Sequence, residues 1–137
     1  MGYLVLGSSG FLGSRIVDFL DANNKVVSIG TNSSNLEDLR FYKKYKYENL
    51  SDKELENLVE QFETVIDASG ISSNNQRYEI ADFFEKNSTW PYRLAKACIN
   101  CNSRLIWLST IHCDNFDVKN ISNFDKYSLS KFVGESL

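Results

Sequence analysis

The stretch that decides the fold is YLVLGSSGFLGSRIVDFL, residues 3–20. It begins with a short apolar run, residues 3–6, which predicts a buried strand. Apolar residues then recur at helical spacing over residues 11–20, which predicts an amphipathic helix. Gly7, Gly10 and Gly13 lie between the two or at the start of the helix. The stretch therefore predicts a strand, a glycine-rich turn and a helix.

Each glycine of this turn has a mechanical reason. Gly7 permits a tight turn, Gly10 lets the backbone approach a pyrophosphate, and Gly13 lets the helix pack closely on a sheet. The free N–H groups and the positive dipole end of the following helix favour a phosphate there. The candidate phosphate-binding residues are Gly7, Ser9, Gly10, Phe11, Leu12 and Gly13. The alternative interpretation is a turn that binds no ligand.

Strands and helices alternate along the rest of the chain. Short apolar or β-branched runs predict strands over residues 25–29, 45–47, 64–68 and 104–109. Helical patterns cover residues 35–42, 52–62, 77–100 and 124–137, with Pro91 interrupting the third of these. Near-continuous apolar strands that alternate with helices are typical of a parallel sheet covered on both faces. We therefore expect an α/β fold.

The composition is that of an ordinary globular chain. The 137 residues are 42% hydrophobic and 24% charged, with a net charge of -3, which fits one domain and gives no basic bias toward nucleic acid. The sequence has no apolar run of membrane-spanning length and no start typical of a signal peptide. We expect a cytoplasmic protein without a membrane partner.

The cysteines Cys98, Cys101 and Cys113 are odd in number, which argues against a disulfide framework. A zinc site would need Cys98 and Cys101 together with the neighbours His112 and Cys113, and two adjacent ligands fit tetrahedral geometry poorly. We favour small buried thiols and expect no metal. His112, the only histidine, is a further candidate proton donor.

The sequence YSLSK, residues 127–131, stands near the end of the chain. On a helix Tyr127 and Lys131 are four residues apart and share a face. A nearby ammonium favours the phenolate form of a tyrosine, so Tyr127 could exchange a proton with a substrate. Ser109 and Thr110 end the predicted fifth strand, and either hydroxyl could donate a hydrogen bond to a substrate oxygen.

The order G-x-x-G-x-x-G, Ser/Thr after the fifth strand, then Y-x-x-x-K in a helix resembles the extended short-chain dehydrogenase/reductase superfamily, of the NAD-dependent epimerase/dehydratase type. The resemblance implies a Rossmann-type doubly wound parallel sheet, three-layer αβα, with strand order 3-2-1-4-5. It implies an NAD(P)-dependent enzyme that acts on a nucleotide sugar as a 4-epimerase or 4-keto reductase. The catalytic residues would be Tyr127 and Lys131, with Thr110 or Ser109. Ile111 and His112 stand where dehydratases of the family carry Asp and Glu, which disfavours dehydration.

The resemblance assigns roles to other residues. The main-chain carbonyl of Asn87 would hold a water in a proton relay, and Pro91 has no N–H to occupy that carbonyl. Alternatively, Pro91 simply starts a new helical segment near a cap at Ser88 or Thr89. Asp52 would touch the adenine, or else cap a helix. Three small residues after the fourth strand would lie along the cofactor, and these are Ala68, Ser69 and Gly70.

The identity of the cofactor depends on the end of the second strand. Gly30 and Thr31 stand where an acidic residue would favour NAD. A 2′-phosphate could bind here instead, with Arg15 or Arg40 neutralising it, so the sequence leans toward NADP and leaves NAD open. The residues that could hydrogen-bond that phosphate are Thr31, Asn32, Ser33 and Ser34. The alternative is a polar loop without selectivity.

The resemblance covers residues 1–137 as the cofactor-binding domain, and we expect the family's substrate domain to be absent from this chain. Two other functions therefore stay open: a non-catalytic NAD(P)-binding regulator, and an inactive truncated cofactor-binding domain. Full-length relatives dimerise through the helix that carries Y-x-x-x-K. We expect exposed apolar surface and a homodimer.

Overall fold

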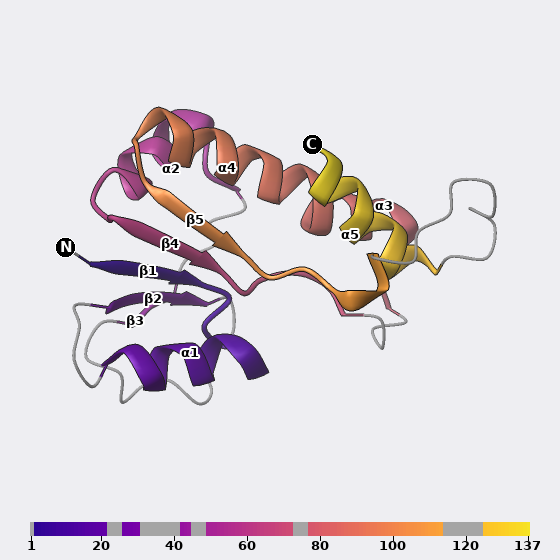
Figure 1. Cartoon of the computed structure of the whole chain (residues 1–137), viewed down its shortest axis with the longest axis horizontal. Helices are drawn as coiled ribbons and strands as arrows, with labels where there is room; N and C mark the ends of the chain where they lie inside the picture. Colours follow the sequence, from indigo (N-terminus) through magenta and orange to yellow (C-terminus); the bar gives the residue numbers. More distant parts are fainter. Residues whose placement is uncertain (1, 22–25, 31–41, 45–48, 73–76, 114–124) are drawn as a thin grey trace. The chain divides into compact units, whose positions relative to one another are not determined.

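The structure is a computed structural model that describes residues 2–21, 26–30, 42–44, 49–72, 77–113 and 125–137 (Figure 1). The chain divides into two compact units. The first, here the sheet unit, consists of residues 1–69 and 94–108. The second, here the helical unit, consists of residues 70–93 and 109–137.

A parallel sheet of five strands forms the centre of the sheet unit. Its strand order is β3-β2-β1-β4-β5. The strands are β1 (Tyr3–Leu6), β2 (Val26–Gly30), β3 (Tyr42–Lys44), β4 (Thr64–Asp67) and β5 (Arg104–Trp107). Because all pairs are parallel, the carboxyl ends of the strands meet at one edge, where a ligand of an open α/β sheet binds. The α/β fold with a parallel sheet is confirmed.

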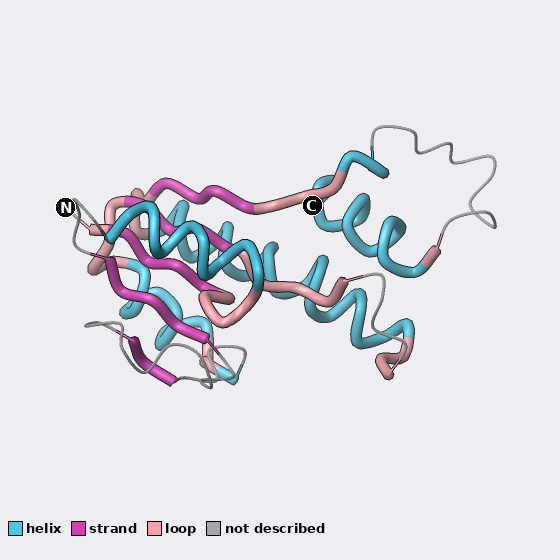
Figure 2. Tube along the Cα trace, turned by 90° about the horizontal axis from the view of Figure 1, so that it is seen from below, coloured by secondary structure: helices cyan, strands magenta, loops and turns pink. Residues whose placement is uncertain are grey.

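The two faces of the sheet bury alternate residues, as a pleated strand requires. Val5 and Ile66 pack with Val17 of α1 (Phe11–Asp21). Leu4 and Val65, which pair in register between β1 and β4, are also fully buried. Figure 1 and Figure 2 both show α1 on one face of the sheet. Figure 1 shows α2 (Asp52–Val59) and α4 (Trp90–Asn100) on the other face.

Helix α2 begins with a reciprocal capping box. Ser51 Oγ accepts from Glu54 N at 3.3 Å, and Ser51 N donates to Glu54 Oε2 at 2.9 Å. These two bonds satisfy backbone donors that a helix start otherwise leaves open. Asp52 is the first residue of the helix, so Ser51 is the cap and the alternative role of Asp52 as a cap is wrong.

The helical unit contains a continuous helical run up to the start of α4. It comprises α3 (Ile80–Phe84), a π-helix (Glu85–Thr89) and the first turn of α4. Trp90 N donates to Glu85 O, five residues back, and Pro91 follows directly. The wide turn changes the bonding pattern where proline lacks an N–H, so the chain continues without a break. The predicted interruption at Pro91 is thus a π-helical turn in a continuous helix, and not a break.

Other predicted boundaries also differ from the structure. The third strand is Tyr42–Lys44, where Tyr42 pairs with Ser28, so the predicted helix 35–42 cannot include Tyr42. The remainder of that helix and the predicted strand 45–47 lie outside the described residues. The last helix, α5 (Lys126–Ser136), starts later than predicted because Asp125 caps it. None of the helices described is both long and apolar enough to cross a membrane.

Candidate functional site: a glycine turn and a buried lysine

The glycine turn follows β1 in the sheet unit. Gly7 has φ +75°, and a Cβ added there would lie 2.6 Å from Ser69 N. A Cβ at Gly13 would collide with the Gly7 carbonyl oxygen, whereas one at Gly10 would meet only that oxygen, at 3.2 Å. Gly7 and Gly13 are therefore required by the close packing of the turn, whereas an added Cβ at Gly10 would make one tight contact, with the Gly7 carbonyl oxygen.

The residues of the glycine turn differ in their exposure to solvent. Four consecutive residues are exposed, and these are Ser9, Gly10, Phe11 and Leu12. Ser8 is fully buried, and its hydroxyl has no hydrogen-bond partner among the described residues. Exposed backbone at the start of an 11-residue helix and an unused buried hydroxyl fit a phosphate group. No sequence pattern distinguishes Ser8 from other turn residues, because serine is common in turns.

The loop after β4 packs on the same turn. Both Ser69 N and Ser69 Oγ donate to Asp67 Oδ1, at 3.0 and 2.5 Å. This bond pattern is a local turn built on an aspartate side chain. It holds Ala68 and Ser69 where a Cβ on Gly7 would strike their backbone. The structure thus brings the predicted residues Ala68 and Ser69 to the glycine turn.

Gly70, Asn87 and Lys131 come together in the helical unit. Gly70 has φ +130°, which favours glycine. A Cβ added there would lie 2.7 Å from Asn87 Oδ1 and 3.5 Å from Lys131 Nζ. Asn87 is fully buried and Lys131 is only 4% exposed. A buried ammonium is costly unless polar groups compensate it, which makes this cluster a functional candidate.

Asn87 contributes its side chain to this cluster. Its amide accepts from Ile71 N at 3.0 Å and donates to Ile71 O at 3.1 Å and to Ser130 Oγ at 3.0 Å. Ser88 Oγ donates to Ser130 O at 2.6 Å, and the helical run passes through Ser88 without a cap. The alternative cap at Ser88 or Thr89 is therefore wrong. The role of the Asn87 main-chain carbonyl in a proton relay stays a prediction.

Helix α5 carries Tyr127 and Lys131. Asp125 caps it by accepting from Tyr127 N at 2.9 Å and from Ser128 N at 3.0 Å. Burial raises the pKa of Asp125, but these hydrogen bonds outweigh it and hold the pKa below its usual value. Lys126 Nζ donates to Tyr78 O at 2.5 Å, and this bond connects the start of α5 to the residues directly before α3. Tyr127 is half-buried.

Ser109 and Thr110 begin the segment that follows β5. Ser109 is exposed and Thr110 is half-buried, and a 3-10 turn (Ile111–Cys113) comes next. Burial raises the pKa of the Cys113 thiol, Glu135 raises it further, and Lys131 opposes this. Those charges lie on α5, so the turn after Thr110 lies beside the helix that carries Tyr127 and Lys131.

The three cysteines are free thiols. Cys98 and Cys113 are buried, as expected, while Cys101 is partly exposed. Burial, with smaller contributions from Cys101 and Asp67, raises the pKa of Cys98 to about 11. In the described part of the chain, no three His, Cys, Asp or Glu side chains are grouped to hold a metal ion.

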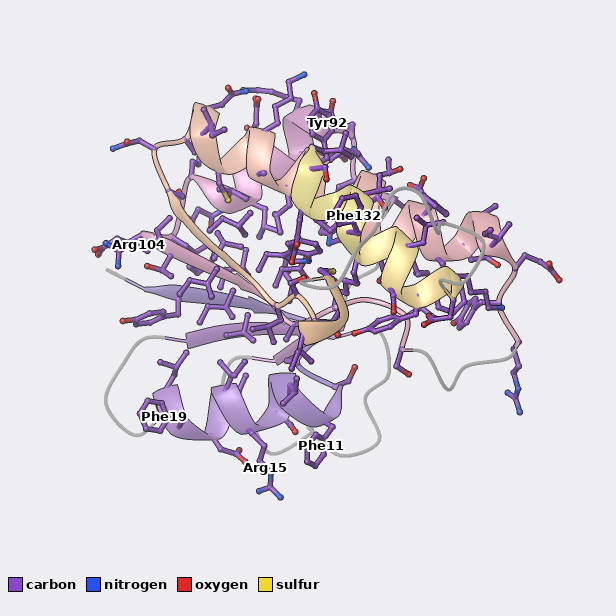
Figure 3. All side chains as sticks on the ribbon, turned by 45° about the vertical axis from the view of Figure 1, so that its right-hand side comes forward. Phe11, Arg15, Phe19, Tyr92, Arg104 and Phe132 are labelled. Atoms are coloured by element: carbon purple, nitrogen blue, oxygen red, sulfur yellow. The ribbon has the colours of Figure 1, made fainter. Side chains whose placement is uncertain are left out.

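The remaining residues predicted to bind the cofactor are Arg15, Thr31, Asn32, Ser33 and Asp52. Thr31, Asn32 and Ser33 lie outside the described residues. Arg15 is exposed and projects from α1 on the side turned away from the sheet, between Phe11 and Phe19 (Figure 3). Asp52 is exposed at the start of α2.

A glycine turn at the carboxyl edge of a parallel sheet defines the class of open α/β proteins that bind ligands at their strand ends. Residues 3–137 match the model of the NAD dependent epimerase/dehydratase family. The chain belongs to this family. No curated protein matches the sequence.

Solved structures show the same fold at low identity. ADP-L-glycero-D-manno-heptose-6-epimerase of Helicobacter pylori is 19% identical with a TM-score of 0.80, and the match covers 98% of this chain and 48% of that one. A hypothetical dTDP-4-dehydrorhamnose reductase from Sulfolobus tokodaii is 23% identical (TM-score 0.78; 99% and 51% covered). UDP-glucuronic acid 4-epimerase from Bacillus cereus, in complex with NAD, is 20% identical (TM-score 0.75; 99% and 50% covered). The chain spans about half the length of these structures.

Proposed function

We propose that the chain binds NAD and is the cofactor-binding part of an enzyme that acts on a nucleotide sugar, as a 4-epimerase or a 4-keto reductase. The observation that carries this proposal is the buried ammonium of Lys131 beside Gly70, on the same helix as Tyr127. Family membership supports it, as do the names of similar structures, two sugar-nucleotide epimerases and a reductase.

On this proposal residues 1–137 are the cofactor-binding domain, a three-layer, doubly wound domain of the Rossmann type. Substrate binding then needs the further length that the similar structures have. The nucleotide sugar is the small-molecule partner, and the homodimer stays a prediction.

Each candidate residue has a chemical role in the proposal. NAD, when bound, supplies the acceptance and return of a hydride. The N–H groups at the start of α1 bind its phosphates beside Gly10, where an added Cβ would meet only the carbonyl oxygen of Gly7. Lys131, whose ammonium borders Gly70, holds the nicotinamide ribose. Tyr127 takes a proton from the sugar hydroxyl and returns it.

A serine or threonine hydroxyl donates a second hydrogen bond to the sugar oxygen that exchanges its proton with Tyr127. Thr110 is the first candidate and Ser109 the second to donate this hydrogen bond. The two follow β5 at its carboxyl end, the edge at which open α/β sheets bind ligands. Asn87 completes the set of proposed catalytic residues.

NAD is the proposed cofactor, because the family description and the Bacillus cereus structure both name it. The lean toward NADP finds no support in the comparisons. It depended on residues 31–33, which lie outside the described residues, and on Arg15, which projects away from the sheet (Figure 3).

A titration with NADH and with NADPH, followed by the fluorescence of Trp90 and Trp107, tests this proposal. We expect micromolar binding of NADH and weaker binding of NADPH. Gly10→Asp puts a carboxylate where the phosphates bind, so binding should weaken more than about tenfold. Asn57→Asp is the matched control, because it adds the same charge at an exposed position of α2. Failure of the unmodified chain to bind either cofactor would contradict the proposal.

A further inference from the structure

The helix that carries Tyr127 and Lys131 is held by polar contacts. Its buried residues are Ser128, Ser130 and Lys131, all of them polar. Hydrophobic burial is non-directional, whereas a hydrogen bond fixes both distance and angle. The orientation of α5 within the helical unit therefore depends strongly on a few hydrogen bonds.

Ser130 makes more of these bonds than its neighbours. Its hydroxyl accepts from Asn87 Nδ2 at 3.0 Å and donates to Tyr127 O at 2.8 Å. Its carbonyl accepts from Ser88 Oγ at 2.6 Å. Ser130, Asn87 and Ser88 are all buried, so water cannot readily replace a lost partner. Two residues of the π-helix thus hold one residue of α5.

The same asparagine lies beside the ammonium. Asn87 is fixed by two hydrogen bonds to the backbone of Ile71, at 3.0 and 3.1 Å. Asn87 Oδ1 and Lys131 Nζ both border Gly70, 2.7 and 3.5 Å from the position of an added Cβ. Ser130 directly precedes Lys131 in the chain. A shift at Ser130 therefore moves the ammonium relative to Gly70.

We infer that Ser130 is a positioning residue: its hydrogen bonds to Asn87 and Ser88 set where Lys131 places its ammonium beside Gly70. This inference rests on the proposed function, in which Lys131 holds the nicotinamide ribose. Ser130 acts through Lys131 and touches neither cofactor nor substrate.

The test compares Ser130→Ala with Ser128→Ala. Ser128 is a matched control, because it is buried in the same helix and its hydroxyl donates one hydrogen bond, to Asp125 Oδ2 at 2.9 Å. Binding of NADH and of ADP is measured for each variant. ADP lacks the nicotinamide ribose, so it reports binding of the adenosine and phosphate part of the cofactor. Ser130→Ala should weaken the binding of NADH about fivefold and leave the binding of ADP unchanged. Ser128→Ala should change neither affinity.

A double-mutant cycle shows whether Ser130 acts through Lys131. In a Lys131→Met background, Ser130→Ala should weaken NADH no further. Equal weakening in both backgrounds would overturn the inference. So would equal loss of ADP and NADH binding, or an equal effect of Ser128→Ala, because each indicates general destabilisation.

A second variant covers the case in which Ser130→Ala does not fold. Ser88→Ala removes only the hydrogen bond to the Ser130 carbonyl. It should weaken NADH without affecting ADP, and wild-type NADH affinity would overturn the inference. If the unmodified chain binds neither ligand, the proposed function and this inference are both contradicted. If the unmodified chain binds both ligands and Ser130→Ala has the same NADH affinity, only the inference is contradicted.

Discussion

Gly7, Gly10 and Gly13 belong to one turn, yet an added methyl group would meet different surroundings at each. At Gly13 it would strike the Gly7 backbone, which cannot move aside as a flexible side chain can. We expect Gly13→Ala to lower the free energy of unfolding by about 1–3 kcal/mol or more. Gly10→Ala, with a single contact at 3.2 Å, should stay close to the wild type. Urea unfolding of both variants checks this, and equal losses would contradict the packing described.

Burial makes Cys98 unreactive. Its pKa of about 11 leaves almost no thiolate at pH 8, and the thiolate is the nucleophile. In the native protein we expect iodoacetamide to modify Cys98 about a hundredfold more slowly than in urea. Cys101, which is partly exposed, should react before it. Mass spectrometry of the alkylated peptides measures both rates, and similar native rates would show that Cys98 is accessible.

The sequence predicts some site residues better than others. Gly7 and Gly13 were found from spacing, because a backbone that must pack closely excludes other residues. Ser130 and Ser88 were not, because a serine in a helix gives no pattern that separates a buried hydroxyl from a solvated one. For Asn87 the position was singled out, but its buried side-chain bonds depend on segments distant in sequence.

At the scale of the element, the start of α5 depends on one carboxylate. Asp125→Ala removes the acceptor for two backbone N–H groups and should cost about 1 kcal/mol. The folded pKa of Asp125 is lowered, so its contribution is complete above the unfolded pKa of about 3.9 and is lost as the pH falls through the folded pKa. The difference between wild type and Asp125→Ala should therefore be full at pH 7 and shrink in acid.

Asp125→Asn is the control for this titration, because asparagine caps a helix without an ionisable group. Thermal unfolding of the three proteins between pH 3 and pH 7 gives the comparison. A cap contribution that does not change with pH in the wild type would show that Asp125 is not ionised in the cap.

Elements with strong patterns were predicted well. β1 and β4 are short apolar runs that the structure buries on both faces of the sheet. β3, Tyr42–Lys44, has only one large apolar residue, and its strand state comes from pairing with β2, which the local sequence does not report. The π-helix was also missed, since a single wide turn barely disturbs a helical pattern of apolar residues.

At the scale of the whole molecule, large apolar side chains remain exposed. Phe11 and Phe19 are 80% and 83% exposed and project from α1 away from the sheet (Figure 3). With a net charge of only -3, we expect the chain to self-associate as its concentration rises. Phe19→Ser should reduce this association and change stability by less than about 0.5 kcal/mol.

Sedimentation velocity at several concentrations measures the association. Asn57→Ser is the control, because Asn57 is exposed on α2 and its replacement leaves the net charge unchanged. An equal effect of both substitutions, or a monomer at every concentration, would show that this face of α1 does not drive association.

The π-helix accommodates one extra residue between α3 and α4. Its wide turn, closed by the bond from Trp90 N to Glu85 O, holds one residue more than an α-helical turn. A related chain that lacked one residue in Glu85–Thr89 could therefore form a regular α-helix whose flanking segments keep their facing. The same loss within α4 would instead rotate the two parts of the helix by about 100° relative to each other. A related chain that lacked Asn87 itself would keep the helix but lose the hydrogen bonds to Ile71 and Ser130.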